Sequence, residues 1–68
     1  MIYLEPRSIL DEAISRIEQV IIYDYDQLIQ CFEMMGMSYI EAVEHIYYNV
    51  ISISMLGWPI IEEAKEEI

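Results

Sequence analysis

Two helix-start signals on either side of a glycine are the strongest constraint on how this chain folds. Asp24 precedes Gln27 by three residues, and Ser38 precedes Glu41 by three residues. A short hydrogen-bond acceptor followed at this spacing by Gln or Glu is typical of the first turn of a helix. Gly36 lies between the two signals and suits the left-handed turn that ends a helix. The sequence therefore predicts two helices joined by a hairpin at Gly36.

The predicted fold class is mainly α. We expect three short helices at about 9–20, 25–35 and 39–52, and the pattern also allows short extended segments at 2–4, 20–23 and 59–61. The first helix depends on an apolar periodicity that follows Ser8, a residue able to cap it. The side chains at helical spacing are Ile9, Leu10, Ala13, Ile14, Ile17 and Ile21. Residues 20–23 are apolar and β-branched, so they are either the end of this helix or a strand, and periodicity does not choose between the two.

A chain of 68 residues is one small domain, here residues 1–68 with an acidic C-terminal tail at 62–68. Domains of this size seldom obtain more than ~3–5 kcal/mol from their own core. The hydrophobic fraction of 56% exceeds the ~45–50% of ordinary soluble proteins. The excess apolar surface predicts an interface, and a homodimer buries it most simply because one self-complementary patch serves both subunits.

The charge balance argues against direct binding of nucleic acid. Thirteen Asp and Glu stand against three Lys and Arg, which gives a formal net charge of −10, whereas phosphate backbones attract clusters of Lys and Arg. Three interpretations remain: an acidic face that only aids solubility, attraction to a basic partner, or imitation of a nucleic acid. The carboxylates expected on the acidic helix faces are Glu12, Glu33, Glu41 and Glu44.

No residue pattern predicts a catalytic, cofactor or metal site. Glu41, Glu44 and His45 are the one cluster of ligand-type side chains, but a chain with a single His cannot complete the usual zinc sites, so we read them as a solvated helix face. Cys31 is alone and lies inside a helix, which indicates packing in a reducing cytosol. The uncharged stretch at 46–61 is too short and too interrupted for a membrane helix. We therefore expect no enzyme, no cofactor and no membrane contact.

The end of the third predicted helix is apolar on every side. Its surplus of aromatic and aliphatic side chains predicts a subunit or partner interface, because Tyr and Met are favoured at protein contacts. The residues assigned to this interface are Tyr47, Tyr48, Ile51, Met55, Leu56 and Trp58.

Two resemblances add a context. The hinge at Met35-Gly36-Met37, with Ala42 after it, is similar to the loop of ubiquitin-associated domains, which are protein-binding modules. Nearly the whole chain resembles a group of small proteins encoded by bacteriophages and prophages, most of them without assigned function. The matching pieces are Leu4-Glu5-Pro6-Arg7, Tyr23-Asp24-Tyr25-Asp26 with Leu28, Ile29 and Phe32, Gly36-Met37-Ser38-Tyr39, Glu41-Ala42-Val43-Glu44, Tyr48-Asn49 and Pro59-Ile60-Ile61.

The phage resemblance implies a site of action in the cytoplasm of the bacterial host. The leading hypothesis is a small non-enzymatic inhibitor that binds a bacterial defence or regulatory protein, acting as a homodimer. The first alternative is an acidic nucleic-acid mimic that blocks a DNA-binding host protein. The second is a phage accessory protein, or a protein-binding module like the ubiquitin-associated domain.

Overall fold

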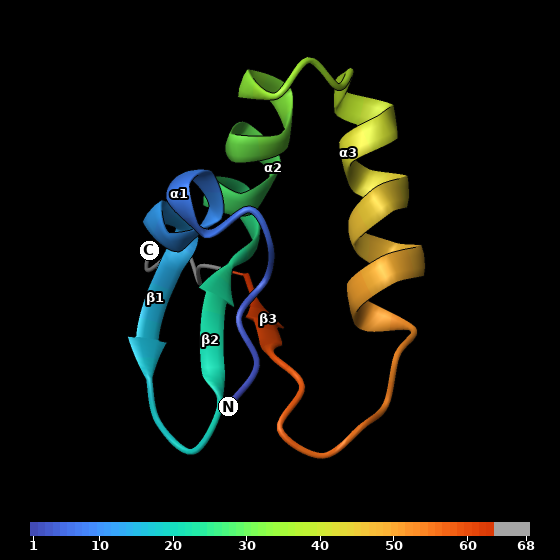
Figure 1. The fold of residues 1–68 in the computed structure, drawn as a ribbon. Helices are drawn as coiled ribbons and strands as arrows, with labels where there is room; N and C mark the ends of the chain where they lie inside the picture. Colours follow the sequence, from blue (N-terminus) through green and yellow to red (C-terminus); the bar gives the residue numbers. More distant parts are fainter. Residues whose placement is uncertain (64–68) are drawn as a thin grey trace, which may run out of the picture.

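The computed structural model describes residues 1–63 and shows a small mixed α/β fold (Figure 1). The elements in chain order are α1 (Arg7–Leu10), the 3-10 turn η1 (Asp11–Ala13), β1 (Ile14–Ile17), β2 (Ile21–Asp24), α2 (Tyr25–Met34), α3 (Tyr39–Ile46), the π-helical η2 (Tyr47–Ile51) and β3 (Ile60–Glu62). The three helices together with η1 and η2 make the described residues 48% helical, and the strands form one mixed sheet. The prediction of a mainly α fold is therefore wrong in class, because it omitted the sheet.

The three strands lie in the order β1-β2-β3. β1 and β2 form an antiparallel hairpin in which Ile17 faces Ile21, while β3 runs parallel to β2 and pairs Ile60 with Ile22. A parallel pair needs a long crossover between its strands, and α2 and α3 supply it. The extended segments considered at 20–23 and 59–61 are thus strands in the structure, whereas residues 2–4 join no strand.

The predicted helix at 9–20 is wrong. Helical structure begins at Arg7, with Pro6 rather than Ser8 at the capping position, and it ends at Ala13. The apolar residues from Ile14 onward match helical spacing, but β-branched side chains are also suited to strands, and pairing between β1 and β2 decides the outcome. No Asn-Gly or similar turn signal marks residues 18–20, so the hairpin had no local signature in the sequence.

The hairpin of α2 and α3 is confirmed. The Asp24 side chain accepts a hydrogen bond from the Gln27 amide at 2.9 Å, and Ser38 and Glu41 form a complete capping box. Gly36 has a positive φ of 102°. Its amide donates to the Glu33 carbonyl, and the following amide of Met37 donates to the Phe32 carbonyl, which is the Schellman pattern of helix ends.

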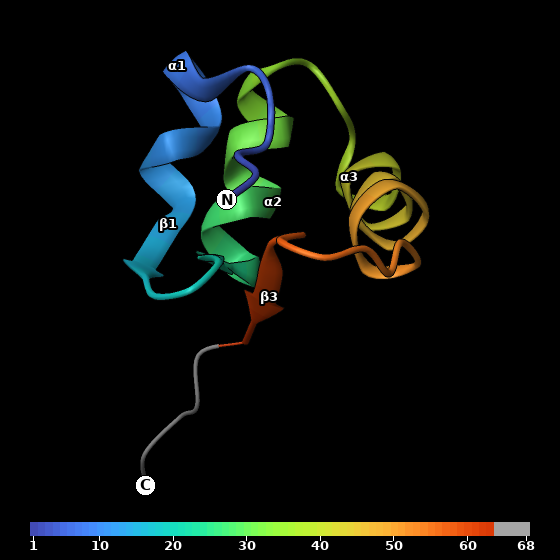
Figure 2. The ribbon, with the colours of Figure 1, turned by 60° about the horizontal axis from the view of Figure 1, so that its bottom comes forward.

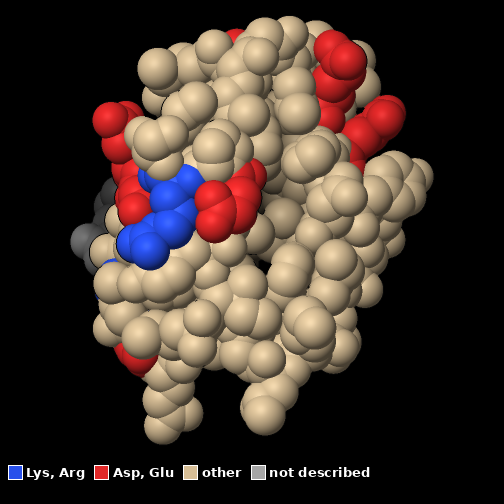
Figure 3. All heavy atoms as spheres, viewed as in Figure 1, with Lys and Arg blue, Asp and Glu red and all other residues tan. Residues whose placement is uncertain are grey.

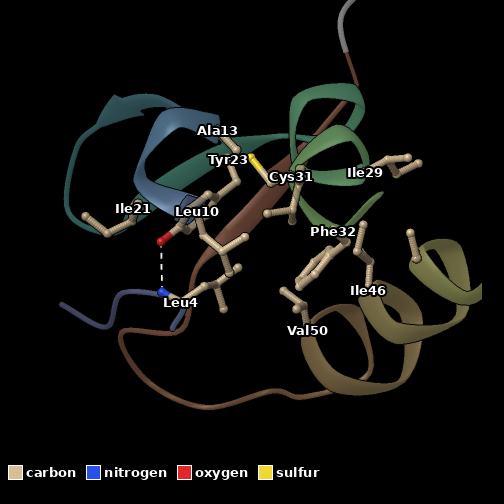
Figure 4. Packing of buried hydrophobic residues seen from close by; sticks show 12 residues of the cluster. Leu4, Leu10, Ala13, Ile21, Tyr23, Ile29, Cys31, Phe32, Ile46 and Val50 are labelled. Carbon is tan, nitrogen blue, oxygen red and sulfur yellow. Dashed lines mark hydrogen bonds between the residues drawn. The ribbon is translucent and has the colours of Figure 1, made fainter. Parts of the chain in front are cut away.

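The core lies between α2 and its neighbours on both sides. In both ribbon views α2 lies between α1 and β1 on one side and α3 on the other (Figures 1 and 2). The buried residues of the core cluster are Leu4, Leu10, Ala13, Ile21, Tyr23, Leu28, Ile29, Cys31, Phe32, Ala42, Ile46 and Val50. The N-terminal segment is held to this core by the Leu4 amide, which donates to the Tyr23 hydroxyl at 2.8 Å (Figure 4).

Two further expectations meet this arrangement. Ubiquitin-associated domains end in a third helix, whereas here the chain continues from η2 into a loop and β3, so that resemblance does not extend to the fold. The predicted acidic tail begins inside the sheet, because Glu62 ends β3. Residues 64–68 of that tail lie outside the described residues.

Candidate protein-binding surface

Helix α3 and its extension η2 lie at one side of the fold and pack against it mainly through one stripe of residues. Ala42, Ile46 and Val50 recur every four residues and are buried, because side chains at this spacing share one helix face. Val43 and His45 beside this stripe are partly buried, and the other residues between Ala42 and Val50 face outward on two different flanks. These two flanks are the candidate binding surface.

The first flank is apolar. We define the apolar flank as Ile40, Tyr47 and Ile51, which share one side of the helix at seven- and four-residue spacing, with Met55 and Leu56 of the following loop. All five side chains are exposed, and Leu56 is completely so. Tyr47 and Ile51 stand at the ends of the π-helical η2, a rare geometry that is often found at functional sites. The sequence predicted all of these residues except Ile40 to lie in an interface. The seven-residue spacing between Ile40 and Tyr47, which places both on one helix face, was the signal that could have added Ile40.

Trp58 ties the loop to the end of η2 and is not itself a free contact. Its indole Nε1 donates to the Val50 carbonyl at 2.7 Å, and its amide donates to the Met55 carbonyl at 3.1 Å. The ring is partly buried and packs against the core. Trp58 therefore fixes the loop that carries Met55 beside η2, which makes it a supporting residue of the surface predicted to include it.

The second flank is acidic. We define the acidic flank as Glu41, Glu44, His45, Tyr48 and Asn49, which together with Met37 line a shallow open hollow of about 310 Å³. Exposed Tyr48 can pack against the apolar stem of a partner's Lys or Arg side chain, while the two carboxylates attract its positive charge.

Several contacts order the acidic flank. The His45 ring packs on Phe32 with ring centroids 4.7 Å apart, and the Asn49 side-chain amide donates to the His45 carbonyl at 3.1 Å. Glu41 accepts a hydrogen bond from the Ser38 amide at 3.0 Å. The backbone and side-chain hydrogen bonds from Ser38 lower the pKa of the Glu41 carboxyl. This carboxylate therefore stays charged to a lower pH than an ordinary glutamate.

The four carboxylates expected on the acidic helix faces are all exposed, but they do not share one face. Glu41 and Glu44 lie together on α3. Glu12 belongs to η1, which packs on the opposite side of α2, and Glu33 belongs to α2 itself. Figure 3 shows the carboxylates of the visible face in separate places with uncharged surface between them. The lower part of the α3 side in that view is free of charged atoms.

The two described arginines are engaged away from α3. Arg7 pairs with Asp11 at 3.2 Å and lies over the Tyr3 ring. Arg16 of β1 reaches across β2, and its two terminal nitrogens donate hydrogen bonds to the two carboxylate oxygens of Glu62 in β3, at 2.9 and 2.8 Å. Arg16 also contacts Glu18. Within residues 1–63, Glu41 and Glu44 therefore meet no positive side chain that would neutralise them.

The remaining candidate groups are placed as follows. The Cys31 thiol is buried and its Sγ lies 3.5 Å from the Ile9 carbonyl oxygen. Burial, with a smaller contribution from Glu12, raises the pKa of this thiol, which keeps it protonated and a poor nucleophile. Within residues 1–63, no three His, Cys, Asp or Glu side chains are grouped to hold a metal ion. No helix of this part of the chain is both long and apolar enough to cross a bilayer.

The fold and surface define a small α/β protein with one two-sided exposed helix. Comparison with protein-family models, with curated proteins and with solved structures found no match. The function therefore has to be argued from the surface itself.

Proposed function

We propose that this chain is a small non-enzymatic phage protein that binds and inhibits a protein of the bacterial host, acting in the host cytoplasm. The observation that carries the proposal is the acidic flank of α3. There, an exposed Tyr and two carboxylates that meet no positive side chain within residues 1–63 surround a hollow.

This flank is suited to a basic surface on the partner. Glu41 and Glu44 attract Lys and Arg over a distance and favour fast association, while Tyr48 supplies an amphipathic contact with little entropy to lose. The net charge of −10 strengthens the attraction to basic partners and repels acidic ones. The resemblance to phage-encoded proteins supplies the host as the source of such a partner.

The placement of the carboxylates favours protein recognition over nucleic-acid mimicry. A mimic has to present carboxylates in place of successive phosphates along one face, whereas Glu12 and the α3 pair lie on different sides of α2. A phage accessory role remains the alternative in which the acidity serves solubility alone.

The experiment is a capture assay with the purified full chain on host lysate, followed by relief tests in cells that carry a panel of defence systems. We compare wild type with Glu44→Gln, which removes a charge from the acidic flank, and with Glu12→Gln as a control of equal charge change elsewhere. We expect one host protein to bind wild type and the control, to bind Glu44→Gln more weakly, and to dissociate as salt is raised. The proposal fails if no host protein is retained and no defence system is relieved.

A further inference from the structure

We infer that the apolar flank of α3 binds a second copy of this chain, which makes the protein a two-fold symmetric homodimer. The inference relies on the proposed function only for the role of the other flank: a dimer formed in this way leaves both acidic flanks open to the host partner.

The exposed area matches what a stable dimer needs. From their fractional exposures, the five residues of the apolar flank, backbone included, present at most roughly 700 Å² to solvent, against the ~800 Å² that each partner buries in a standard interface. A monomer rarely leaves a patch of this size uncovered. The hydrogen bonds of Trp58 hold the loop part of the patch beside η2, so little ordering remains to be done when a partner binds.

The distribution of charge selects a second copy as the occupant. From Ile46 to Ile61 the chain contains no Asp, Glu, Lys or Arg, so two apolar flanks can meet without burying a charge. Glu41 stands on the other flank of the helix, and Glu44, four residues after Ile40, lies at the border between the two flanks. A face-to-face pair of apolar flanks therefore keeps Glu41 away from the contact and leaves Glu44 at its exposed rim.

The line of side chains along α3 is also compatible with a two-fold axis. Ile40 and Ile51 stand on either side of Tyr47 on the same flank. In an antiparallel pair of helices, Ile40 of one copy meets the partner's Ile51, and the reverse contact forms at the same time, as a self-complementary interface requires. Tyr47 then lies near the axis, where an aromatic anchor contributes most.

The test measures solution mass by light scattering and sedimentation across protein concentration at low and high salt. We expect a species of twice the 8.1 kDa chain mass. We also expect dimerisation to tighten several-fold between about 20 mM and 500 mM salt, because screening relieves the repulsion between two chains of −10. Binding of a basic host protein has the opposite salt dependence, so the two associations are separable in one titration.

Two neighbouring tyrosines provide a matched pair of variants. Tyr47 and Tyr48 are both exposed and their rings meet edge to face at 5.4 Å, yet they belong to different flanks. Tyr47→Glu places an unpaired charge in the dimer contact and is expected to weaken it at least about 100-fold. Tyr48→Glu is expected to leave the dimer intact. Circular dichroism tests whether each variant is folded. If Tyr47→Glu does not fold, Ile51→Glu provides a second change expected to disrupt the dimer.

The outcomes separate this inference from the proposed function. A monomer at every concentration and salt overturns the dimer even if a host protein is captured, and so does a dimer that Tyr48→Glu disrupts while Tyr47→Glu and Ile51→Glu do not. A dimer with the expected variant pattern supports the inference even if no host protein is retained, in which case only the proposed function fails.

Discussion

Replacing Tyr23 with Phe removes a single oxygen atom from the middle of the core. The Tyr23 side chain has no exposed surface, and its hydroxyl accepts the hydrogen bond of the Leu4 amide at 2.8 Å. Phe fills the same ring volume but leaves this buried N–H without an acceptor, which costs about 1–3 kcal/mol. For a domain of this size, that loss lowers the melting temperature by roughly 4–24 °C.

Urea unfolding followed by Trp58 fluorescence and far-ultraviolet circular dichroism measures the change. Tyr25→Phe is the matched control, since this ring also packs against the core and no hydrogen bond of its hydroxyl is found within residues 1–63. We expect the control to remain near the wild-type free energy of unfolding. If Tyr23→Phe loses no more stability than Tyr25→Phe, the hydrogen bond to Leu4 does not hold the N-terminal segment in solution.

The same substitution has a consequence for alkaline stability. Burial raises the pKa of the Tyr23 phenol in the folded protein, with a smaller opposing effect of its hydrogen bond to Leu4. A group whose pKa is higher in the folded than in the unfolded state contributes stability that is complete below the unfolded value of ~10 and is lost as pH rises through the folded value. Wild type should therefore destabilise more steeply above about pH 10 than Tyr23→Phe. Parallel pH profiles of the two proteins would contradict this assignment.

Three further predictions test the helix hairpin and the core. Ser38→Ala removes the capping box of α3 and should cost about 1 kcal/mol in urea unfolding, whereas Ser8→Ala, at a position that caps no helix, should be nearly neutral; equal effects would contradict the capping argument. Gly36→Ala should cost about 1–2 kcal/mol through backbone strain at φ 102°. The added methyl group meets no atom within 4 Å, so steric overlap adds nothing to this cost. An unchanged unfolding midpoint would refute the prediction. The Cys31 thiol should react with a disulfide reagent at least about 100-fold more slowly in the native protein than in denaturant, so rapid native labelling would show that the site opens.

The helix hairpin was predictable because its signals are local. The capping pairs at Asp24 and Ser38 and the left-handed Gly36 act within a few residues, so the sequence alone contains the whole interaction. The same locality accounts for the apolar end of the third helix, since an excess of apolar side chains over one helical face is visible in the spacing. Tyr47, Ile51 and Leu56 are exposed in the structure, and their place in an interface stays a prediction.

The sheet was not predictable in the same way. Residues 9–21 satisfy a helical periodicity, and only pairing of β1 with β2, and of β2 with β3 almost forty residues later, makes an extended conformation the better one. Ile22 shows the effect: its side chain is buried outside the main core cluster, in a strand paired on both sides. Burial of a central strand on both faces removes the alternation that identifies strands in a sequence.

The sequence by itself determined the α2–α3 hairpin, the acidity and the surplus of apolar side chains, because these depend on composition and on contacts within one or two helical turns. Tertiary structure decided that residues 14–24 form a hairpin of strands, that Trp58 is partly buried and fixes the loop beside η2, and that Glu12 is separated from Glu41 and Glu44. The physical reason is common to all three, because each outcome depends on which distant segment of the chain packs beside the residue concerned. The free energy that selects this neighbour comes from long-range strand pairing and burial, which no local sequence pattern contains.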